Sequence, residues 1–162
     1  MRLTNPAVRA ATNADAEAVQ ALIFAVLEEY GLPPDPAKTD RDLFDLEGSY
    51  FNRPGFDRPG YFGVVEQDHL IVATVGLLKL DDTSCELRKM YALPSVRGQG
   101  LGRLLVDFAV ATARTWQCQR MVLDTASVLR EAIALYQRYG FKPYHPPCIT
   151  GRCDLAMELW LT

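Results

Sequence analysis

The stretch YALPSVRGQGLGRLLVDFAVATAR, residues 91–114, decides the fold because it sets three glycines within five positions directly against a strong helix former. From position 101 onward, residues suited to a buried face recur at i, i+3, i+4 and i+7. They are Leu101, Leu104, Leu105, Phe108, Ala109 and Thr112. The spacing predicts an amphipathic helix over residues 101–116.

The glycines before this helix suggest an anion-binding corner. The first turn of a helix has N–H groups without intrahelical partners, and the helix dipole adds partial positive charge there. Gly98, Gly100 and Gly102 carry no side chains that would block a ligand, and Arg97 and Arg103 flank the opening with positive charge. Together they predict a cradle for a phosphate or diphosphate, the alternative being a plain helix start after a flexible loop.

Two common phosphate-binding motifs do not fit. A P-loop needs a Gly-Lys-Ser/Thr end, and no lysine stands at that position here. A dinucleotide fingerprint needs a third glycine where this chain has Arg103 or Leu105, although Asp124 lies near the distance of a ribose-binding acid.

Composition restricts the function classes. The chain has 162 residues, 49% of them hydrophobic and 23% charged, with a formal net charge of -3. We expect one domain, residues 1–162, no nucleic-acid partner, and no membrane association, because the longest apolar run is ALIFAVL at 21–27. The start shows no signal-peptide pattern, so a cytoplasmic location is expected. His145, Cys148 and Cys153 share one loop without a usual ligand spacing, so no metal site is expected.

The order of elements predicts a mixed α/β or α+β domain around one central sheet. A first strand at 8–12 precedes a helix that Asn13 or Asp15 caps and Gly31 ends, and Thr39 is expected to cap a second short helix. Later elements follow turn signals and periodicity. They are strands at 61–67, 70–80 and 85–93 forming an antiparallel meander, the helix at 101–116, a strand at 120–125, a helix at 129–139, and strands at 141–144 and 154–161.

Two motifs at this separation carry a family resemblance. R-x-x-G-x-G is filled by Arg97, Gly100 and Gly102 after a strand, and LYQRYGF stands at 135–141 after the next strand. The chain resembles the GNAT superfamily of acyl-CoA-dependent N-acetyltransferases, closely over residues 60–142. The resemblance implies a central, mostly antiparallel mixed sheet flanked by helices.

The resemblance also implies acetyl-CoA as co-substrate. The strand before the glycines would hold the pantetheine arm by main-chain hydrogen bonds, here from Met90 and Ala92. The residues expected to bind the diphosphate are Arg97, Gly98, Gln99, Gly100, Leu101, Gly102 and Arg103. Many relatives carry an asparagine where this chain has Leu129, so that cofactor contact is not carried over, and Ser127 or backbone groups are the alternatives.

Attack of an amine on a thioester needs a proton acceptor, an oxyanion donor and an acid for the leaving thiolate. Glu86 is the expected base, with a solvated glutamate or a partner of Arg88 as the alternative. Tyr136 is the expected acid, with a core tyrosine as the alternative, and Tyr139 is expected to pack. A main-chain N–H near Met90 is the expected oxyanion donor.

The acceptor side has weaker signals. Asp40, Asp42, Asp45 and Glu47 suit a cationic acceptor, or form an acidic first turn or solvated face. Tyr50, Phe51 and YHPP at 144–147 could line an acceptor pocket. His145 would position or deprotonate the amine there, the alternative being a loop histidine with no such role.

We expect direct acetyl transfer in a ternary complex to a primary amine of a small molecule or amino acid. A protein or peptide amine, a non-catalytic CoA-binding sensor and, less favoured, a covalent acyl group on Cys85 are the alternatives. The strand at 154–161 could pair across a homodimer.

Overall fold

The computed structural model describes residues 1–149 and 151–161. Its strands form a seven-stranded sheet in the spatial order β1-β2-β3-β4-β5-β7-β6. β4 and β5 run parallel, and every other neighbouring pair is antiparallel. The strands are β1 (Val8–Ala10), β2 (Gly60–Gln67), β3 (Leu70–Lys79), β4 (Ser84–Ala92), β5 (Arg120–Thr125), β6 (Lys142–Tyr144) and β7 (Leu155–Trp160). The predicted mixed and mostly antiparallel sheet is confirmed.

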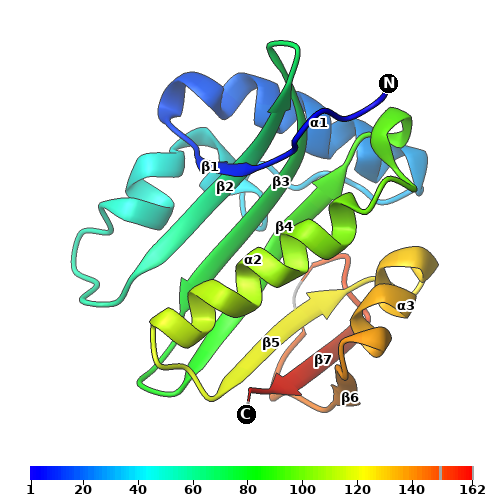
Figure 1. The fold of residues 1–162 in the computed structure, drawn as a ribbon. Helices are drawn as coiled ribbons and strands as arrows, with labels where there is room; N and C mark the ends of the chain where they lie inside the picture. Colours follow the sequence, from blue (N-terminus) through cyan, green and yellow to red (C-terminus); the bar gives the residue numbers. More distant parts are fainter. Residues whose placement is uncertain (150, 162) are drawn as a thin grey trace.

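Helices cover both faces of the sheet (Figure 1). α2 (Leu101–Thr115) and α3 (Arg130–Arg138) pack on one face, and α1 (Ala16–Glu29) lies on the other. One cluster of buried side chains lies between the sheet and α2 and α3, and a second lies between α1 and the half of the sheet that contains β2. Strand β4 therefore lies between two separately packed layers.

The long helix confirms the periodicity of the opening stretch. α2 begins at Leu101 after Gly100, and its buried residues follow helical spacing. They are Leu101, Leu105, Val106, Ala109, Val110 and Ala113. Burying an aliphatic side chain of this size stabilises the fold by about 1.5–3 kcal/mol, so this face fixes α2 on the sheet.

The antiparallel meander is also confirmed, and its turns have local causes. Asp68 and His69 join β2 to β3 with φ angles of 51° and 65°, the left-handed pair that suits a two-residue hairpin. Asp81 precedes β4, and its carboxylate accepts hydrogen bonds from the backbone N–H groups of Thr83 at 2.9 Å and Ser84 at 2.8 Å. These contacts fix where β3 ends and β4 begins.

The expected second short helix is present only as two separate turns. A 3-10 helix (η2, Arg41–Phe44) is followed by a π-helical turn (η3, Glu47–Phe51). Asp45 separates them because its carboxylate accepts a hydrogen bond from the N–H of Gly48 at 2.9 Å, a local bond that competes with a continuous α-helix. Thr39 is not the cap, since Asp40 precedes η2.

The closing strand is not at an edge of the sheet. β7 pairs with β5 on one side and with β6 on the other, so the suggested pairing of residues 154–161 across a dimer is wrong for the stretch that β6 covers. A homodimer formed in another way stays a prediction. Within residues 1–149 and 151–161, the helices are all too short or too polar to cross a membrane.

Candidate active site

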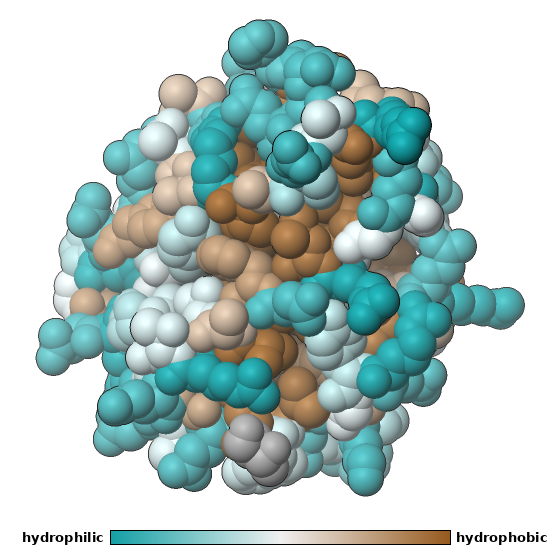
Figure 2. Space-filling model, viewed as in Figure 1, coloured by the Kyte–Doolittle hydropathy of each residue, from teal (hydrophilic) through white to brown (hydrophobic). Residues whose placement is uncertain are grey.

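A cleft opens where β4 and β5 separate. The two strands pair only over Ser84–Glu86 and Arg120–Val122, and beyond these residues they line a cleft of about 430 Å³. Its walls also include the first turn of α2, the inner side of α3 and the end of α1. Apolar residues gather over the middle of this face, with hydrophilic residues around them (Figure 2).

A β-bulge in β4 accompanies the separation. Thr74 of β3 is opposite Tyr91 and Gly76 is opposite Arg88, so two residues of β4 stand against one residue of β3. Lys89, in the bulge, has a φ of 53°, which is uncommon outside glycine. The Thr74 hydroxyl donates a hydrogen bond to the carbonyl oxygen of Lys89 at 2.7 Å. Bulges bend the strand that carries them, and this one lies in the part of β4 that is no longer paired with β5.

The glycine corner lies at one end of the cleft. Gly98 and Gly100 have φ angles of 75° and 81°, and an added Cβ would meet nothing within 4 Å at either position. These two glycines are therefore needed for backbone conformation as well as for access. Glycine is required at position 102 for a different reason: a Cβ there would lie 2.8 Å from Leu135 Cδ2 of α3. Each of the three glycines lines the cleft, and so does Leu101.

Two of the predicted corner residues make other contacts. The Arg97 guanidinium donates to both carboxylate oxygens of Glu29 at 2.7 and 2.9 Å and to the carbonyl oxygen of Ala92, so its charge is largely neutralised. The Gln99 side chain binds the backbone of Met1 and Leu3 at 2.6 and 2.9 Å. Arg97 lines the cleft, as expected of a residue at the opening, but its charge is shared with Glu29. Gln99 is not among the residues that line the cleft.

Two exposed arginines supply the positive charge at this end. Arg103 of α2 and Arg138 of α3 both line the cleft. Sequence reasoning missed Arg138, although a signal exists: it follows Leu135 by three residues and so shares its helix face. Once Leu135 is known to contact Gly102, that spacing places Arg138 at the same corner.

Tyr136 lines the cleft from α3 and is 5% exposed. Its ring packs against Phe141 with centroids 5.5 Å apart. Burial, and to a lesser degree the nearby Tyr91, raises the pKa of the Tyr136 hydroxyl, so the phenol stays protonated at neutral pH. In the part of the chain that the structure describes, no hydrogen-bond partner is found for this hydroxyl. It is therefore a neutral donor that faces the cleft.

Comparison with known proteins agrees with this geometry. The model of the Acetyltransferase (GNAT) family matches residues 22–141. The chain belongs to the GNAT family. An uncharacterised N-acetyltransferase of Escherichia coli (strain K12), YjgM, is 37% identical over 163 residues, which cover 96% of this chain and 93% of YjgM. The protein is thus an N-acetyltransferase.

Solved structures show the same fold. A GNAT-family acetyltransferase of Staphylococcus aureus Mu50 superposes with a TM-score of 0.86 at 21% identity and covers 97% of this chain and 99% of its own. The PaiA N-acetyltransferase of Thermoplasma acidophilum, solved in complex with coenzyme A, has a TM-score of 0.74 at 15% identity and covers 98% and 100%.

In this GNAT protein two carboxyl groups, Glu86 and Asp124, are candidates for the expected base. Glu86 lies outside the residues that line the cleft, and its carboxylate accepts a hydrogen bond from Arg88 at 3.2 Å. Asp124 lines the cleft from β5. Burial raises the pKa of both carboxyl groups, and Arg88 partly offsets the rise in each. From the sequence, Asp124 is considered only as a ribose-binding acid. Its place near the carboxyl end of a strand parallel to β4 is the signal that would have put it in the site, because ligands bind at that end of the strands in α/β sheets.

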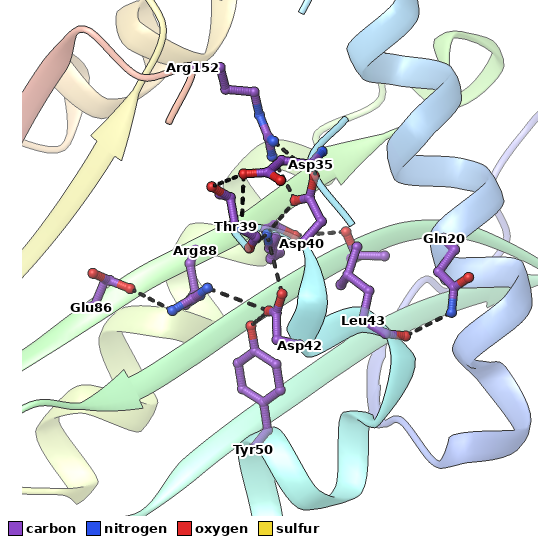
Figure 3. A network of polar contacts seen from close by, with 12 residues as sticks. Gln20, Asp35, Thr39, Asp40, Asp42, Leu43, Tyr50, Glu86, Arg88 and Arg152 are labelled. Atoms are coloured by element: carbon purple, nitrogen blue, oxygen red, sulfur yellow. Dashed lines mark hydrogen bonds and ion pairs between the residues drawn. The ribbon is translucent and has the colours of Figure 1, made fainter. Parts of the chain in front are cut away.

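The acidic cluster proves to be partly internal. The Asp40 side chain is 0% exposed, so a solvated face is the wrong interpretation for this residue. Its carboxylate accepts hydrogen bonds from Lys89 Nζ at 2.6 Å and from both terminal nitrogens of Arg152 at 2.8 Å each. Although burial alone would raise it, the hydrogen bonds from Arg152 and Lys89 hold the pKa of Asp40 at about 2. We call Asp40, Lys89 and Arg152 the Asp40 cluster; Figure 3 labels Asp40 and Arg152.

A second set of charges continues from this cluster. Asp42 accepts a hydrogen bond from the Tyr50 hydroxyl and lies 3.5 Å from the Arg88 guanidinium, which in turn contacts Glu86 (Figure 3). Tyr50 is fully buried, and burial raises its pKa well above the usual value. Tyr50 is therefore a core residue, and its expected place in an acceptor pocket is wrong.

The other expected acceptor residues also lie away from the cleft lining. Phe51 packs on Tyr61 with ring centroids 5.4 Å apart, and Tyr144 packs on the Arg120 guanidinium at 4.7 Å. His145 is exposed. The loop between β6 and β7 instead contributes Arg152 and Cys153 to the cleft.

Leu129, which stands where many relatives carry an asparagine, places an apolar side chain at the cleft. Leu129 lines the cleft directly before α3. Ser127 does not replace the asparagine, because its N–H and its hydroxyl both donate to the Asp154 carboxylate at 2.7 Å.

Proposed function

We propose that this N-acetyltransferase moves an acetyl group from acetyl-CoA to a primary amine of a small molecule or amino acid, by direct attack in a ternary complex. One observation carries the proposal: the gap between β4 and β5 connects the glycine corner to the hydroxyl of Tyr136 within one cleft. This arrangement suits an extended ligand that is anionic at one end and reactive at the other. The coenzyme A complex of PaiA supports the choice of donor.

The residues present fit coenzyme A. The open first turn of α2 offers amide groups for the diphosphate, with Arg103 and Arg138 adding charge. Beyond Glu86 the edge of β4 is not paired with β5, so main-chain groups near Met90 and Ala92 are available to the amides of the pantetheine arm. Bound there, acetyl-CoA supplies the activated thioester. Arg97 would then support the loop, through Glu29, more than it would bind phosphate.

The chain's own groups divide the proton and charge transfers. A carboxylate at the cleft takes a proton from the amine, and Asp124 is better placed for this than Glu86, which stays the second candidate. A raised carboxyl pKa brings a base closer to neutral pH, where general-base catalysis is most efficient. A main-chain N–H near Met90 donates to the carbonyl oxygen as charge develops on it. The Tyr136 hydroxyl protonates the departing sulfur.

Direct transfer fits the state of the thiols. Burial raises the pKa of the Cys85 thiol, which lies in the core next to Cys118. Burial also raises the pKa of the Cys153 thiol, with Asp124 adding to the rise. A thiol in this state is a poor nucleophile, because the thiolate is the reactive form. Cys153→Ser is accordingly expected to keep turnover, and no acetylated cysteine is expected by intact-mass spectrometry.

The test is release of free CoA from acetyl-CoA with a library of amines, amino acids and peptides, followed by variants on the best acceptor. Tyr136→Phe is expected to lower kcat by about 10- to 100-fold, within the range of general acid catalysis. Tyr139→Phe is the matched control. Tyr139 directly follows α3, and its hydroxyl donates to Asp107 Oδ1 at 2.5 Å, lies 3.2 Å from the Arg103 carbonyl oxygen, and faces a different surface hollow. Its kcat should stay within about twofold of wild type.

The carboxyl variants separate the two candidates for the base. Asp124→Asn is expected to abolish the acidic limb of the kcat/KM profile, and Glu86→Gln to alter it less. The reverse order would assign the base to Glu86. Turnover on peptides alone would identify a protein acetyltransferase, and tight CoA binding without turnover on any amine would identify a sensor and refute the proposal.

A further inference from the structure

The bulge of β4 is held in place by a buried lysine. The Lys89 side chain is 4% exposed, and its ammonium group donates to Asp40 Oδ1 at 2.6 Å and to the carbonyl oxygen of Thr39 at 2.8 Å. Its ammonium also lies 3.4 Å from Asp42 Oδ1. A lysine normally keeps its charge in water, so complete burial is expected only where partners satisfy it. Here three oxygen atoms from the segment before and within η2 do so.

The backbone of Lys89 is in a conformation that its own chemistry disfavours. A non-glycine residue with positive φ costs roughly 1–3 kcal/mol and persists only where the surroundings impose it. Two contacts impose it here: Thr74 binds the Lys89 carbonyl oxygen from β3, and Asp40 binds the ammonium. Neither Thr74 nor Asp40 belongs to α2, to α3 or to the glycine corner.

Asp40 is itself fixed from a third direction. Arg152, in the loop between β6 and β7, makes a two-pronged contact with its carboxylate, and the N–H of Asp35 donates to the same group at 2.8 Å. The carboxylate therefore joins the segment before η2, the bulge of β4 and the loop before β7. Lys89, Arg152 and the residues on both sides of the bulge all line the cleft.

We propose that Lys89 and Asp40 are positioning residues for the acetyl transfer: their buried ion pair holds the bulge of β4 so that a main-chain N–H beside it points at the thioester oxygen. The inference rests on the proposed function. Neither side chain needs to touch the substrates, because the pair acts through the direction of the backbone. Oxyanion donors work only when they are fixed before the reaction, and a misplacement of about 1 Å costs up to about 100-fold in rate.

The most direct test is the infrared carbonyl band of acetyl-CoA labelled with ¹³C at the thioester carbonyl. In the wild-type complex a hydrogen bond to the oxygen should shift the band to lower wavenumber, without any acceptor present. Lys89→Gly should lose most of that shift, although glycine tolerates the positive φ, because the tether to Asp40 is gone. Lys89→Met, which keeps most of the side-chain volume without the charge, should behave alike.

Kinetics give a second readout that a purely structural role would not produce. Both Lys89 variants should lower kcat by about 10- to 100-fold while the KM for acetyl-CoA changes less than about threefold, because the diphosphate corner is untouched. Lys79→Met is the matched control: Lys79 stands at the far end of β3 and donates to the carbonyl oxygen of Trp116 at 2.7 Å. It should lose stability without loss of kcat or of the infrared shift.

A variant that leaves all charges in place guards against loss of folding. Thr74→Val removes the hydroxyl that binds the Lys89 carbonyl oxygen while keeping the side-chain shape, so it should reduce the shift and kcat in the same direction. An unchanged band in folded Lys89→Gly and Thr74→Val would overturn the inference and leave the proposed function standing. A wild-type protein that does not bind acetyl-CoA would refute the proposed function, and the inference with it.

Discussion

The buried carboxylate of Asp40 makes the stability of this protein depend on pH in a calculable way. Asp40 is ionised between Lys89 and Arg152, and its pKa falls from 3.8 to about 2 in the folded protein. The folded state therefore binds the proton more weakly than the unfolded chain does. The resulting stabilisation is present in full above the unfolded value and disappears as the pH falls through the folded one.

The size of the effect follows from the same two values. A change in pKa from 3.8 to about 2 corresponds to about 2.5 kcal/mol of stability at neutral pH. About 1 kcal/mol of this is lost between pH 7 and pH 3, and about 2 kcal/mol by pH 2. Asp40→Asn cannot carry the charge, and at neutral pH it removes the carboxylate that Lys89 and Arg152 share, leaving Lys89 only the more distant Asp42 at 3.4 Å. Breaking a buried pair in this way costs about 3–5 kcal/mol.

The measurement is the difference in unfolding free energy between wild type and Asp40→Asn, from urea titrations between pH 7 and pH 2. Taking this difference removes the contributions of the carboxyl groups that both proteins share. These include Glu86 and Asp124, whose raised pKa values make the protein more stable, not less, as the pH falls. It should be largest at neutral pH and narrow by about 1 kcal/mol at pH 3. Asp82→Asn is the control, because the Asp82 side chain is 99% exposed. A difference that stays constant down to pH 2 would show that Asp40 is not held ionised by the cluster.

Two further predictions concern the cofactor end of the cleft. Arg103→Ala and Arg138→Ala should each weaken CoA binding about 5- to 10-fold at low salt, with a smaller effect at high salt, whereas Arg97→Ala should have the smallest effect because Glu29 already neutralises that charge. Calorimetric titrations at two salt concentrations measure these affinities. A loss of affinity in Arg97→Ala as large as in the other two variants would contradict the prediction. Gly100→Val should weaken CoA binding and also lower the melting temperature, because a β-branched residue is strained at a φ of 81°, so an unchanged melting temperature would argue against the left-handed turn.

Local signals were sufficient for much of the fold. The helix at 101–116 follows from the spacing of its apolar residues, and the meander follows from alternation between turn residues, both of which depend only on near neighbours. That the three glycines line a cleft could be predicted because glycines, a helix start and charge lie together in one short segment, whereas diphosphate binding there stays a prediction. Arg97 shows the limit: its motif position was clear, but its ion pair with Glu29 joins residues 68 apart in the sequence.

The features that sequence reasoning missed depend on long-range contacts. Asp40 looked like one member of an acidic run because its partners, Lys89 and Arg152, lie 49 and 112 residues away. The bulge had no signal, since nothing about a lysine predicts a positive φ. Because the sequence does not show the bulge, it also does not show where β4 stops pairing with β5. It therefore could not tell which of Glu86 and Asp124 lines the cleft.

The position of the cleft also separates donor binding from acceptor choice. Its lining comes from α2 and α3 on one face of the sheet, and from the end of α1 and the loop before β7, including Arg152 and Cys153, on the other. If the diphosphate is bound at the start of α2, the thioester reaches the strand gap from that face, and the amine must come from the opposite one. Acceptor selectivity then falls to the segments on that opposite face. The end of α1 also supports the glycine corner, because Glu29 binds Arg97. Substitutions in the loop before β7 should therefore change the amine used while the affinity for coenzyme A stays the same.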